Sequence, residues 1–266
     1  MSGGIKVAVV GALGKMGLQT VKAVLQDSDL ELAAAVDIKG RGESIAELTG
    51  IKKCTVRIIS DIESVLLGRG ADVIVDFTTP EAVYKNVSQA LNNGVACVVG
   101  TTGLNDNELK EFDEIAQAKG IGVAVMPNFA VGAVLMMKFA QEAARYFPDV
   151  EIIELHHDQK LDAPSGTSIK TAELIKQNRI PQIPKKTNEY EKFAGCRGGD
   201  VEQVRIHSVR LPGLVAHQEV IFGGIGQTLA IRHDSYDRIG FMQGVLMVIK
   251  KMTTLTGLVY GMENLL

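Results

Sequence analysis

The chain has 266 residues, of which 46% are hydrophobic, so it holds enough apolar material for one large domain or two modest ones and is not expected to be disordered. Its net charge of −3 comes without a clustered basic excess, which argues against a nucleic-acid-binding surface, and the sequence predicts neither export nor membrane insertion. The three cysteines, Cys54, Cys97 and Cys196, show no Cys-x-x-Cys spacing, which predicts neither disulfides nor a metal site and indicates a reduced, cytoplasmic protein.

The first predicted unit is a strand, a glycine turn and a helix. Residues 5–10 form an apolar run of strand length, and a helix carrying Val21 and Val24 follows a turn with the spacing Gly-x-x-Gly-x-x-Gly. Such a turn lets a pyrophosphate rest on the N–H groups of the helix start, because no side chain stands in the way. A tight turn that merely needs glycine is the alternative. The predicted dinucleotide contacts are Gly11, Ala12, Leu13, Gly14, Lys15 and Met16.

The next predicted strand comprises residues 32–36, and the choice of cofactor depends on the loop that follows it. Asp37 ends this strand, where an acidic side chain accepts hydrogen bonds from the adenosine ribose; a glycine turn alone does not explain it. The carboxylate favours NADH because it repels the 2′-phosphate of NADPH. Lys39 and Arg41 follow on a glycine-flanked loop and can reach that phosphate. We therefore predict that NADH and NADPH both bind, with a modest preference for NADH.

Buried runs separated by helices continue through the first half of the chain. The expected strands are residues 72–77, 95–99 and 122–125, and the expected helices are residues 80–91 and 105–118. This alternation predicts an α/β fold with a Rossmann-like, doubly wound parallel sheet, whose ligands bind beyond the carboxyl ends of the strands. The cofactor-binding residues expected in these loops are Phe77, Gly100, Thr101, Thr102, Met126, Pro127, Asn128 and Phe129.

The pattern changes after residue 130. The expected elements are a helix over 131–146, an apolar strand over 150–155, a helix ending at Asn178, a proline- and glycine-bearing loop over 180–200, strands over 204–211, 215–222 and 228–234, and a last helix over 237–252. Short glycine-bearing turns predict that the three strands form an antiparallel meander. The last helix is apolar enough to pack back on the first domain.

These patterns predict two domains. The dinucleotide-binding domain comprises residues 1–129 and 237–266 and is therefore discontinuous. Residues 130–236 form a second, α+β domain that binds the substrate and contains a mixed, largely antiparallel sheet.

The stretch 154–167 gathers two imidazoles, an amine and a helix start. An apolar, β-branched strand precedes it, so His156 and His157 should lie at the exposed end of that strand. Residues 162–165 indicate a helix N-terminus, with Asp162 as the capping side chain and a proline in the first turn. Free N–H groups at such a start attract carboxylates, so together with Lys160 they predict a pocket for an acidic substrate. A solvated loop before an ordinary capped helix is the alternative.

This stretch, Glu-Leu-His-His-Asp-Gln-Lys-Leu-Asp-Ala-Pro-Ser-Gly-Thr, closely resembles the signature of the dihydrodipicolinate reductase family. The resemblance implies that His156 is the proton donor and that Lys160 is a catalytic lysine. The substrate-binding residues that it implies are His157, Lys160, Ser165, Gly166, Thr167 and Arg238. It also implies the substrate, 4-hydroxy-tetrahydrodipicolinate, a cyclic imine dicarboxylate that is reduced to tetrahydrodipicolinate and water in diaminopimelate and lysine synthesis.

The resemblance covers essentially the whole chain. The sequences Gly-Thr-Thr-Gly at 100–103 and Pro-Asn-Phe at 127–129 match family loops that flank the nicotinamide. The family also implies a homotetramer in which the sheets of the substrate domains pair. Two positions depart from it: the family usually has serine at Ala130 and often has arginine at Ile38, so neither a hydroxyl nor a phosphate contact is expected there. At Arg238 a plain surface arginine is the alternative.

Hydride transfer from a reduced nicotinamide requires an acid for the carbanion-like product, and His156 is the residue we assign to that role. Lys160 is expected to pair with one substrate carboxylate, while the helix start binds the other. A semialdehyde or phosphorylating aldehyde dehydrogenase would instead need a reactive cysteine, and Cys97 lies inside an apolar run where its thiol should be inert. A nucleotide sensor without chemistry would not need Lys160 beside two histidines.

Overall fold

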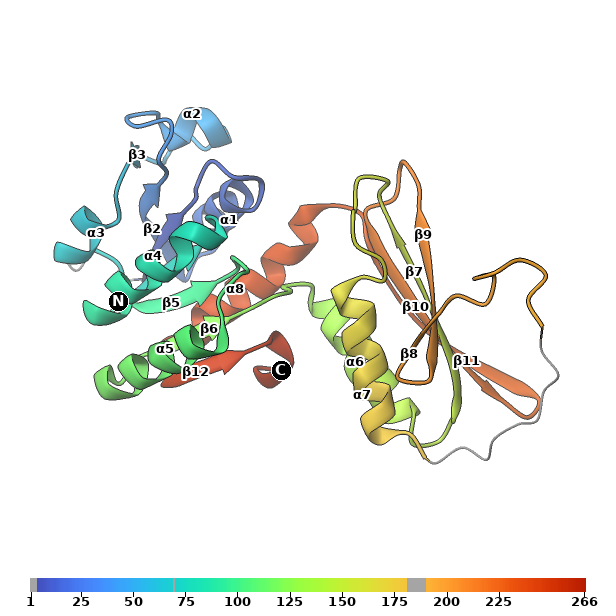
Figure 1. Ribbon diagram of the computed structural model, residues 1–266. Coiled ribbons are helices and arrows are strands. Elements are labelled where there is room, and N and C mark those ends of the chain that lie inside the picture. The colour runs from blue at the N-terminus through green and yellow to red at the C-terminus, as the bar shows by residue number, and fades with distance from the viewer. Residues whose placement is uncertain (1–3, 69, 181–189) are drawn as a thin grey trace. The chain divides into compact units, whose positions relative to one another are not determined.

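The computed structural model describes residues 4–68, 70–180 and 190–266. The chain divides into two compact units, the first formed by Met1–Phe129 together with Phe241–Leu266 and the second by Ala130–Gly240 (Figure 1). The chain therefore returns to the first unit at Phe241, four residues after the position that the sequence pattern indicates. In the described part of the chain, no helix is both long and apolar enough to cross a membrane.

Within the described residues, the first unit is built on a seven-stranded sheet in the order β12-β6-β5-β4-β1-β2-β3, with all neighbours parallel. Its strands are β1 (Ile5–Val10), β2 (Leu30–Val36), β3 (Ile58–Ile59), β4 (Val73–Asp76), β5 (Ala96–Val99), β6 (Gly122–Val125) and β12 (Gly257–Tyr260). In β1, Val7 and Val9 face one side of the sheet, Ala8 and Val10 face the other, and all four are buried. A strand covered on both faces is apolar throughout, as its sequence indicates.

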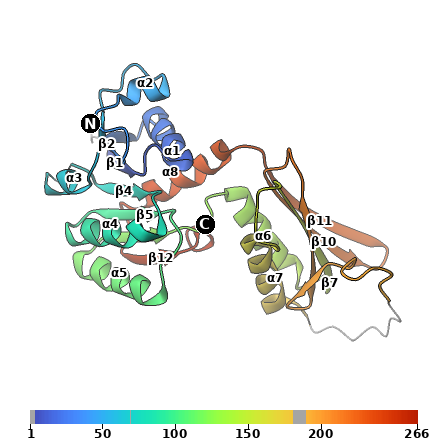
Figure 2. The ribbon, with the colours of Figure 1, turned by 45° about the horizontal axis from the view of Figure 1, so that its top comes forward.

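Helices cover both faces of this sheet (Figure 2). The buried residues of α3 (Glu63–Leu67), α4 (Pro80–Asn92) and α5 (Asp106–Lys119) share one hydrophobic core with one face. On the other face, α1 (Lys15–Gln26) contacts α8 (Met242–Lys251). The unit also contains the short elements α2 (Ile45–Thr49) and η2 (Met262–Asn264). The predicted doubly wound parallel sheet is confirmed.

The second unit contains, within the described residues, a five-stranded mixed sheet in the order β11-β10-β7-β9-β8. Its strands are β7 (Asp149–His156), β8 (Gly199–Val201), β9 (Val204–Arg210), β10 (Ala216–Gly224) and β11 (Gln227–Ser235). The helices α6 (Val131–Ala143) and α7 (Gly166–Asn178) pack against each other and on this sheet. Burial alternates along β7, as expected for a strand with one covered face. The predicted α+β unit with a mixed, largely antiparallel sheet is confirmed.

The antiparallel meander predicted for the last three strands is wrong. Strands β10 and β11 do form an antiparallel hairpin, but β7 lies between β9 and β10 and is parallel to β9. The turn at Gly213 therefore joins two strands that are not neighbours. Turn residues indicate where a chain reverses, whereas the neighbour of a strand is decided by burial. Strand β7 takes the central place, with Ile152 fully buried.

Several shorter elements were not predicted, because two to five residues are too few to show a period. They are β3, β8, α2 and α3, and the predicted scheme also lacked β12. The last helix begins at Met242 and not near residue 237, because a 3₁₀ turn, η1 (Arg238–Phe241), precedes it. Of the predicted loop over 180–200, residues 181–189 lie outside the described residues, and β8 begins within its last two residues.

Leu91 tests the core of the first unit. Leu91 of α4 is fully buried in the core shared with the parallel sheet, whereas Leu67 of α3 is 76% exposed. We expect Leu91→Ala to lower the free energy of unfolding by about 2–5 kcal/mol, because it removes buried methyl groups and leaves a cavity. Leu67→Ala, the same change at a surface position, should alter it by about 0.5 kcal/mol or less. Urea unfolding measures both, and equal losses would contradict the assignment of Leu91 to the core.

Candidate active site

The turn between β1 and α1 leaves room for a ligand at the start of the helix. Gly11 has a φ of +80°, and a Cβ atom on it would lie 2.4 Å from the carbonyl oxygen of Phe77. A Cβ atom on Gly17 would lie 2.0 Å from the carbonyl oxygen of Gly11. Both glycines are therefore required by close backbone approach. Helix α1 has Gly14 at its N-cap and no acidic residue in its first turn, so its free N–H groups can bind an anion.

Asp37 holds this turn from the end of β2. Its Oδ2 atom accepts a hydrogen bond from the backbone N–H of Leu13 at 2.9 Å, and its Oδ1 atom accepts one from the backbone N–H of Lys39 at 3.0 Å. A carboxylate has about four acceptor sites, so both oxygens can still accept from a ribose hydroxyl. Lys39 and Arg41 are exposed. Arg57 donates to the carbonyl oxygen of Gly42 at 2.8 Å and so restrains the loop that carries them.

A buried carboxyl group joins two of the loops predicted to bind the cofactor. Asp76, the last residue of β4, has no exposure to solvent. Its Oδ1 atom accepts hydrogen bonds from the backbone N–H of Thr78 at 3.0 Å, from the Thr78 hydroxyl at 2.7 Å and from the Thr101 hydroxyl at 2.7 Å. Its Oδ2 atom accepts from the amide of Asn86 at 2.9 Å. Asp76 therefore fixes the loop after β4 to the loop after β5, a role that the sequence did not reveal.

The loop after β6 packs against the loops that follow β4 and β5. The rings of Phe77 and Phe129 lie 5.6 Å apart, and a Cβ atom on Gly100 would lie 2.1 Å from the Phe77 ring and 3.0 Å from the Phe129 ring. The predicted cofactor residues thus all belong to loops at the carboxyl ends of parallel strands or to the first turn of α1. Ala12 and Met126 are almost fully buried, so neither offers an exposed side chain to a ligand.

The second group of predicted residues is organised by the end of β7. His156 is the last residue of that strand and lies on the same face as Glu154, two residues earlier. The side chain of His156 is only 14% exposed, and its Nδ1 atom contacts Oε2 of Glu154. The expectation of two histidines at an exposed strand end is therefore wrong for His156, although His157 is exposed. The pKa of His156 is lowered, chiefly by burial; the charges of Lys160 and Arg210 act in the same direction, and the contact with Glu154 acts in the opposite one.

Glu154 is fully buried and forms an ion pair with Arg210 of the neighbouring strand β9. The guanidinium donates from Nη2 to Oε1 at 2.7 Å and from Nη1 to Oε2 at 2.8 Å. Burial raises the pKa of Glu154, but hydrogen bonds from Arg210, Ser208 and His156 more than offset it, and the pKa is lowered overall. Glu154 is therefore ionised at neutral pH. The two-residue spacing of Glu154 and His156 was the only sequence signal for this contact, and Arg210 had none.

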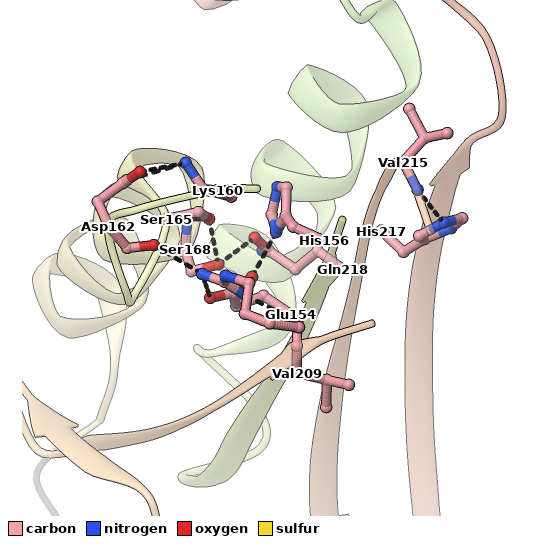
Figure 3. A network of polar contacts seen from close by, with 11 residues as sticks. Glu154, His156, Lys160, Asp162, Ser165, Ser168, Val209, Val215, His217 and Gln218 are labelled. Atoms are coloured by element: carbon pink, nitrogen blue, oxygen red, sulfur yellow. Dashed lines mark hydrogen bonds and ion pairs between the residues drawn. The ribbon is translucent and has the colours of Figure 1, made fainter. Parts of the chain in front are cut away.

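Lys160 is paired with Asp162 (Figure 3). Its ammonium group donates to Oδ1 and Oδ2 of Asp162 at 2.7 and 2.9 Å, and this contact lowers the pKa of the Asp162 carboxyl group.

Asp162 is therefore not the cap of α7. The N-cap is Ser165, and Pro164 precedes the helix, which corrects the helix start expected at 162–165. A hydroxyl three residues later makes the capping contact because the chain from 162 to 164 does not turn as a helix.

A chain of buried hydrogen bonds fixes the start of α7. The Ser165 hydroxyl accepts from the backbone N–H of Ser168 at 3.2 Å, and the two hydroxyls lie 2.8 Å apart. Ser168 then donates to Oε1 of Gln218 on β10 at 2.8 Å (Figure 3). The Gln218 amide donates in turn to the Thr171 hydroxyl at 2.8 Å. Gln218 is also the register partner of Glu154. The first N–H groups of α7, at Gly166 and Thr167, are thus held beside the His156 strand.

Arg210 connects these groups, because its Nη2 atom also donates to the carbonyl oxygen of Asp162 at 2.8 Å. The structure therefore brings His156 and Lys160 together around one guanidinium. The predicted residues Ser165, Gly166 and Thr167 lie at the start of α7, which Gln218 joins to the same sheet. Arg238 begins η1 and is exposed, and among the contacts of the described residues none joins it to this group. In the same described ranges, no group of three or more His, Cys, Asp or Glu side chains could hold a metal ion.

Comparison with known proteins gives a consistent result. The family model described as dihydrodipicolinate reductase, N-terminus, matches residues 5–129, and the one described as its C-terminus matches residues 132–266. The chain is 64% identical over 261 residues to the 4-hydroxy-tetrahydrodipicolinate reductase of Syntrophomonas wolfei, covering 98% of each chain. It is 53% identical to that of Listeria welshimeri, over 98% of this chain and 100% of the relative.

A solved structure gives the same likeness. The dipicolinate-bound dihydrodipicolinate reductase from Paenisporosarcina sp. TG-14 matches with a TM-score of 0.88 at 46% identity, over 99% of this chain and 100% of that chain.

Asp76→Ala tests whether the buried carboxyl group prepares the first set of loops for a dinucleotide. The change removes the acceptor of Thr78, Thr101 and Asn86, and unsatisfied buried donors cost about 1–3 kcal/mol. We expect the Kd for NADH to rise about tenfold, which corresponds to about 1.4 kcal/mol. Asp72→Ala is the matched control, since Asp72 immediately precedes β4 and its carboxylate accepts a hydrogen bond from the backbone N–H of Lys6 at 2.8 Å. Calorimetry that finds equal Kd values for the two folded variants would contradict this role.

Proposed function

Since the chain belongs to the dihydrodipicolinate reductase family, we propose that its two groups of site residues carry out the reduction of 4-hydroxy-tetrahydrodipicolinate by a reduced pyridine nucleotide. The chain is an oxidoreductase of diaminopimelate and lysine synthesis, and its products are tetrahydrodipicolinate and water. The observation that carries the residue assignments is the connected group in which one guanidinium joins the His156–Glu154 pair to the loop of Lys160.

The glycine turn fits a dinucleotide. Gly11 and Gly17 keep it free of side chains, the start of α1 offers N–H groups to a pyrophosphate, and Asp37 keeps free acceptor sites for ribose hydroxyls. We assign Thr101, Thr102 and Asn128 to the nicotinamide end, because they lie in the loops that Asp76 and Phe129 hold together. A reduced nicotinamide bound there supplies a hydride.

The second group of residues fits a dicarboxylate, and the relative from Paenisporosarcina sp. TG-14 is described with dipicolinate bound. Lys160 is 21% exposed on its side chain, and its pairing with the exposed Asp162 is of the kind that contributes little, so a substrate carboxylate can replace that partner. The N–H groups of Gly166 and Thr167 bind the second carboxylate. No acidic residue occupies the first turn of α7 to compete for them. His157 and Arg238 are exposed and can approach the same ligand.

His156 donates the proton. Hydride addition leaves a carbanion-like product, and an acid close to it must protonate the neighbouring carbon. In the free protein the lowered pKa of His156 leaves the imidazole neutral at neutral pH. Two substrate carboxylates bring negative charge that favours the imidazolium, so His156 takes up a proton as substrate binds and releases it to the product. The imidazole is then returned to its neutral form.

Other readings of the same residues fit less well. An aldehyde dehydrogenase needs a thiolate, but Cys97 is fully buried and burial raises the pKa of its thiol well above the usual value. A nucleotide sensor leaves the Glu154–His156 pair and Lys160 without a purpose. Assembly as a homotetramer and a cytoplasmic location belong to this proposal too, supported by the family, and light scattering in solution tests the first.

The reaction and its acid are tested together. Wild-type protein should oxidise NADH only when substrate is generated in situ from pyruvate and aspartate semialdehyde, and absence of this oxidation refutes the proposed function. His156→Gln should lower kcat by roughly 10² to 10⁴, because the acid is lost, and leave the Kd for NADH nearly unchanged. His207→Gln, the same change at a histidine that pairs with Glu151, is the control and should keep kcat. Wild-type kcat in His156→Gln would remove His156 from the mechanism.

The preference between cofactors is a separate prediction. Asp37 repels the 2′-phosphate of NADPH, while the exposed Lys39 and Arg41 attract it, so we expect kcat/KM to favour NADH by a modest factor. Higher salt should weaken the binding of NADPH more than the binding of NADH, because the additional contact to the 2′-phosphate is ionic and exposed. Lys39→Ala and Arg41→Ala should lower kcat/KM for NADPH alone. A strong NADPH preference that persists at high salt would show that Asp37 does not face the ribose.

A further inference from the structure

We propose that Glu154, anchored by Arg210, is the positioning residue that fixes His156 in its Nδ1–H tautomer, so that Nε2 is the atom that carries the catalytic proton. This inference rests on the proposed function for the meaning of that proton. The tautomer itself is a property of the free protein and can be measured without substrate or cofactor.

The donors around Glu154 determine the tautomer. Oε2 of Glu154 faces Nη1 of Arg210 and Nδ1 of His156, and Oε1 faces Nη2 of Arg210. A guanidinium can only donate, so a proton on either carboxyl oxygen would oppose an N–H group. The carboxyl group is therefore a carboxylate, which can only accept. The Nδ1 atom of His156 must then be the donor.

The tautomer also fixes the state of Nε2, the other ring nitrogen of His156. In the neutral imidazole one nitrogen carries the proton and the other is bare, and the bond made by the first decides which is which. With the proton on Nδ1 held by Glu154, Nε2 is bare and points away from the carboxylate (Figure 3). Histidine side chains in water favour the opposite tautomer. Glu154 therefore selects the form in which Nε2 can take up a proton and deliver it.

Glu154 also supplies the negative charge that balances the cations around the ring. Within the described residues, the charged groups that act on His156 are Glu154 of its own strand, Arg210 of β9 and Lys160 of the following loop. Its partner on β10 is Ala216, which carries no charge. Both cations oppose protonation of the imidazole, and Glu154 alone favours it. Loss of this carboxylate should therefore remove the protonated form as well as the orientation.

Arg210 gives the arrangement its rigidity. It binds both oxygens of Glu154 and also donates to the carbonyl oxygens of Val209 and Asp162, each at 2.8 Å. The carboxylate is thus fixed relative to the backbone of β9 and to the loop that carries Lys160. Its position follows from the strand register, in which Arg210 pairs with His156 and Ser208 with Glu154.

The first experiment measures the tautomer directly. The chain has five histidines, so the ¹⁵N spectrum of histidine-labelled protein is simple, and the signals of His156 are those that disappear in His156→Gln. At a pH where His156 is neutral, we expect a protonated Nδ1 and a bare Nε2. An Nε2–H tautomer in the wild-type protein would overturn the inference, whether or not the protein is a reductase.

The second experiment compares two changes on one strand. Glu154→Gln keeps the size of the side chain and removes its charge, so kcat should fall by roughly 10² to 10⁴, the larger figure being the loss seen when the acid that orients a catalytic histidine is replaced by its amide. The alkaline limb of the pH dependence of kcat/KM should move to lower pH by about one unit or more, because the imidazolium has lost its counter-charge. Glu151→Gln is the matched control, since Glu151 lies on the opposite face of β7 and pairs with Arg197 and His207.

The outcomes distinguish a positioning role of Glu154 from a purely structural role, and they separate this inference from the proposed function. A fall in kcat without movement of the alkaline limb would mean that Glu154 only supports the fold, and the inference would fail. Glu154→Asp, which keeps the charge, should retain the wild-type limb even where its kcat is reduced. If Glu154→Gln does not fold, the wild-type tautomer and the Glu154→Asp profile still decide the question. If wild-type protein shows no substrate-dependent NADH oxidation, the proposed function fails while the tautomer result stands.

Discussion

A carboxyl group that is shut off from water must be surrounded by hydrogen-bond donors, and this requirement shapes both parts of the chain. Asp76 and Glu154 are each fully buried near the carboxyl end of a strand. Asp76 is satisfied by hydroxyl, amide and backbone donors, so it fixes two loops to each other. Glu154 is satisfied by a guanidinium and an imidazole, so it fixes a charge and a ring orientation.

The difference in donors fits the different roles that we propose for the two carboxylates. Loops that surround a dinucleotide need a defined shape, and neutral donors supply it without adding charge. An imidazole that handles a proton needs a defined tautomer and a counter-charge, and only an ionised carboxylate supplies both. The start of α7 follows the first pattern, because Ser168, Thr171 and Gln218 hold it with neutral hydrogen bonds. Its N–H groups then remain available to a substrate carboxylate.

The strands and long helices were predictable because each contains its own signal. Strand β1 is an uninterrupted apolar run, and α5 begins with a capping box formed by Asn105 and Glu108. The order of the strands had no such signal. The meander was predicted from turn residues near Gly213, yet β7 separates β9 from β10. Strand neighbours are chosen by how apolar faces are buried across the whole sheet, and the period of one segment does not contain that information.

The sequence by itself determined the parts of the site that depend on neighbouring residues in the chain. The glycine turn before α1, Asp37 after β2, and the run from His156 to Thr167 are local, since each needs only a turn, a strand end or a helix start. Only the tertiary structure decided which partners these residues have. Arg210 reaches Glu154 because β9 lies parallel to β7, across 56 positions of sequence. Such a contact exists only once the sheet has formed, because strand pairing brings together side chains that no local pattern relates.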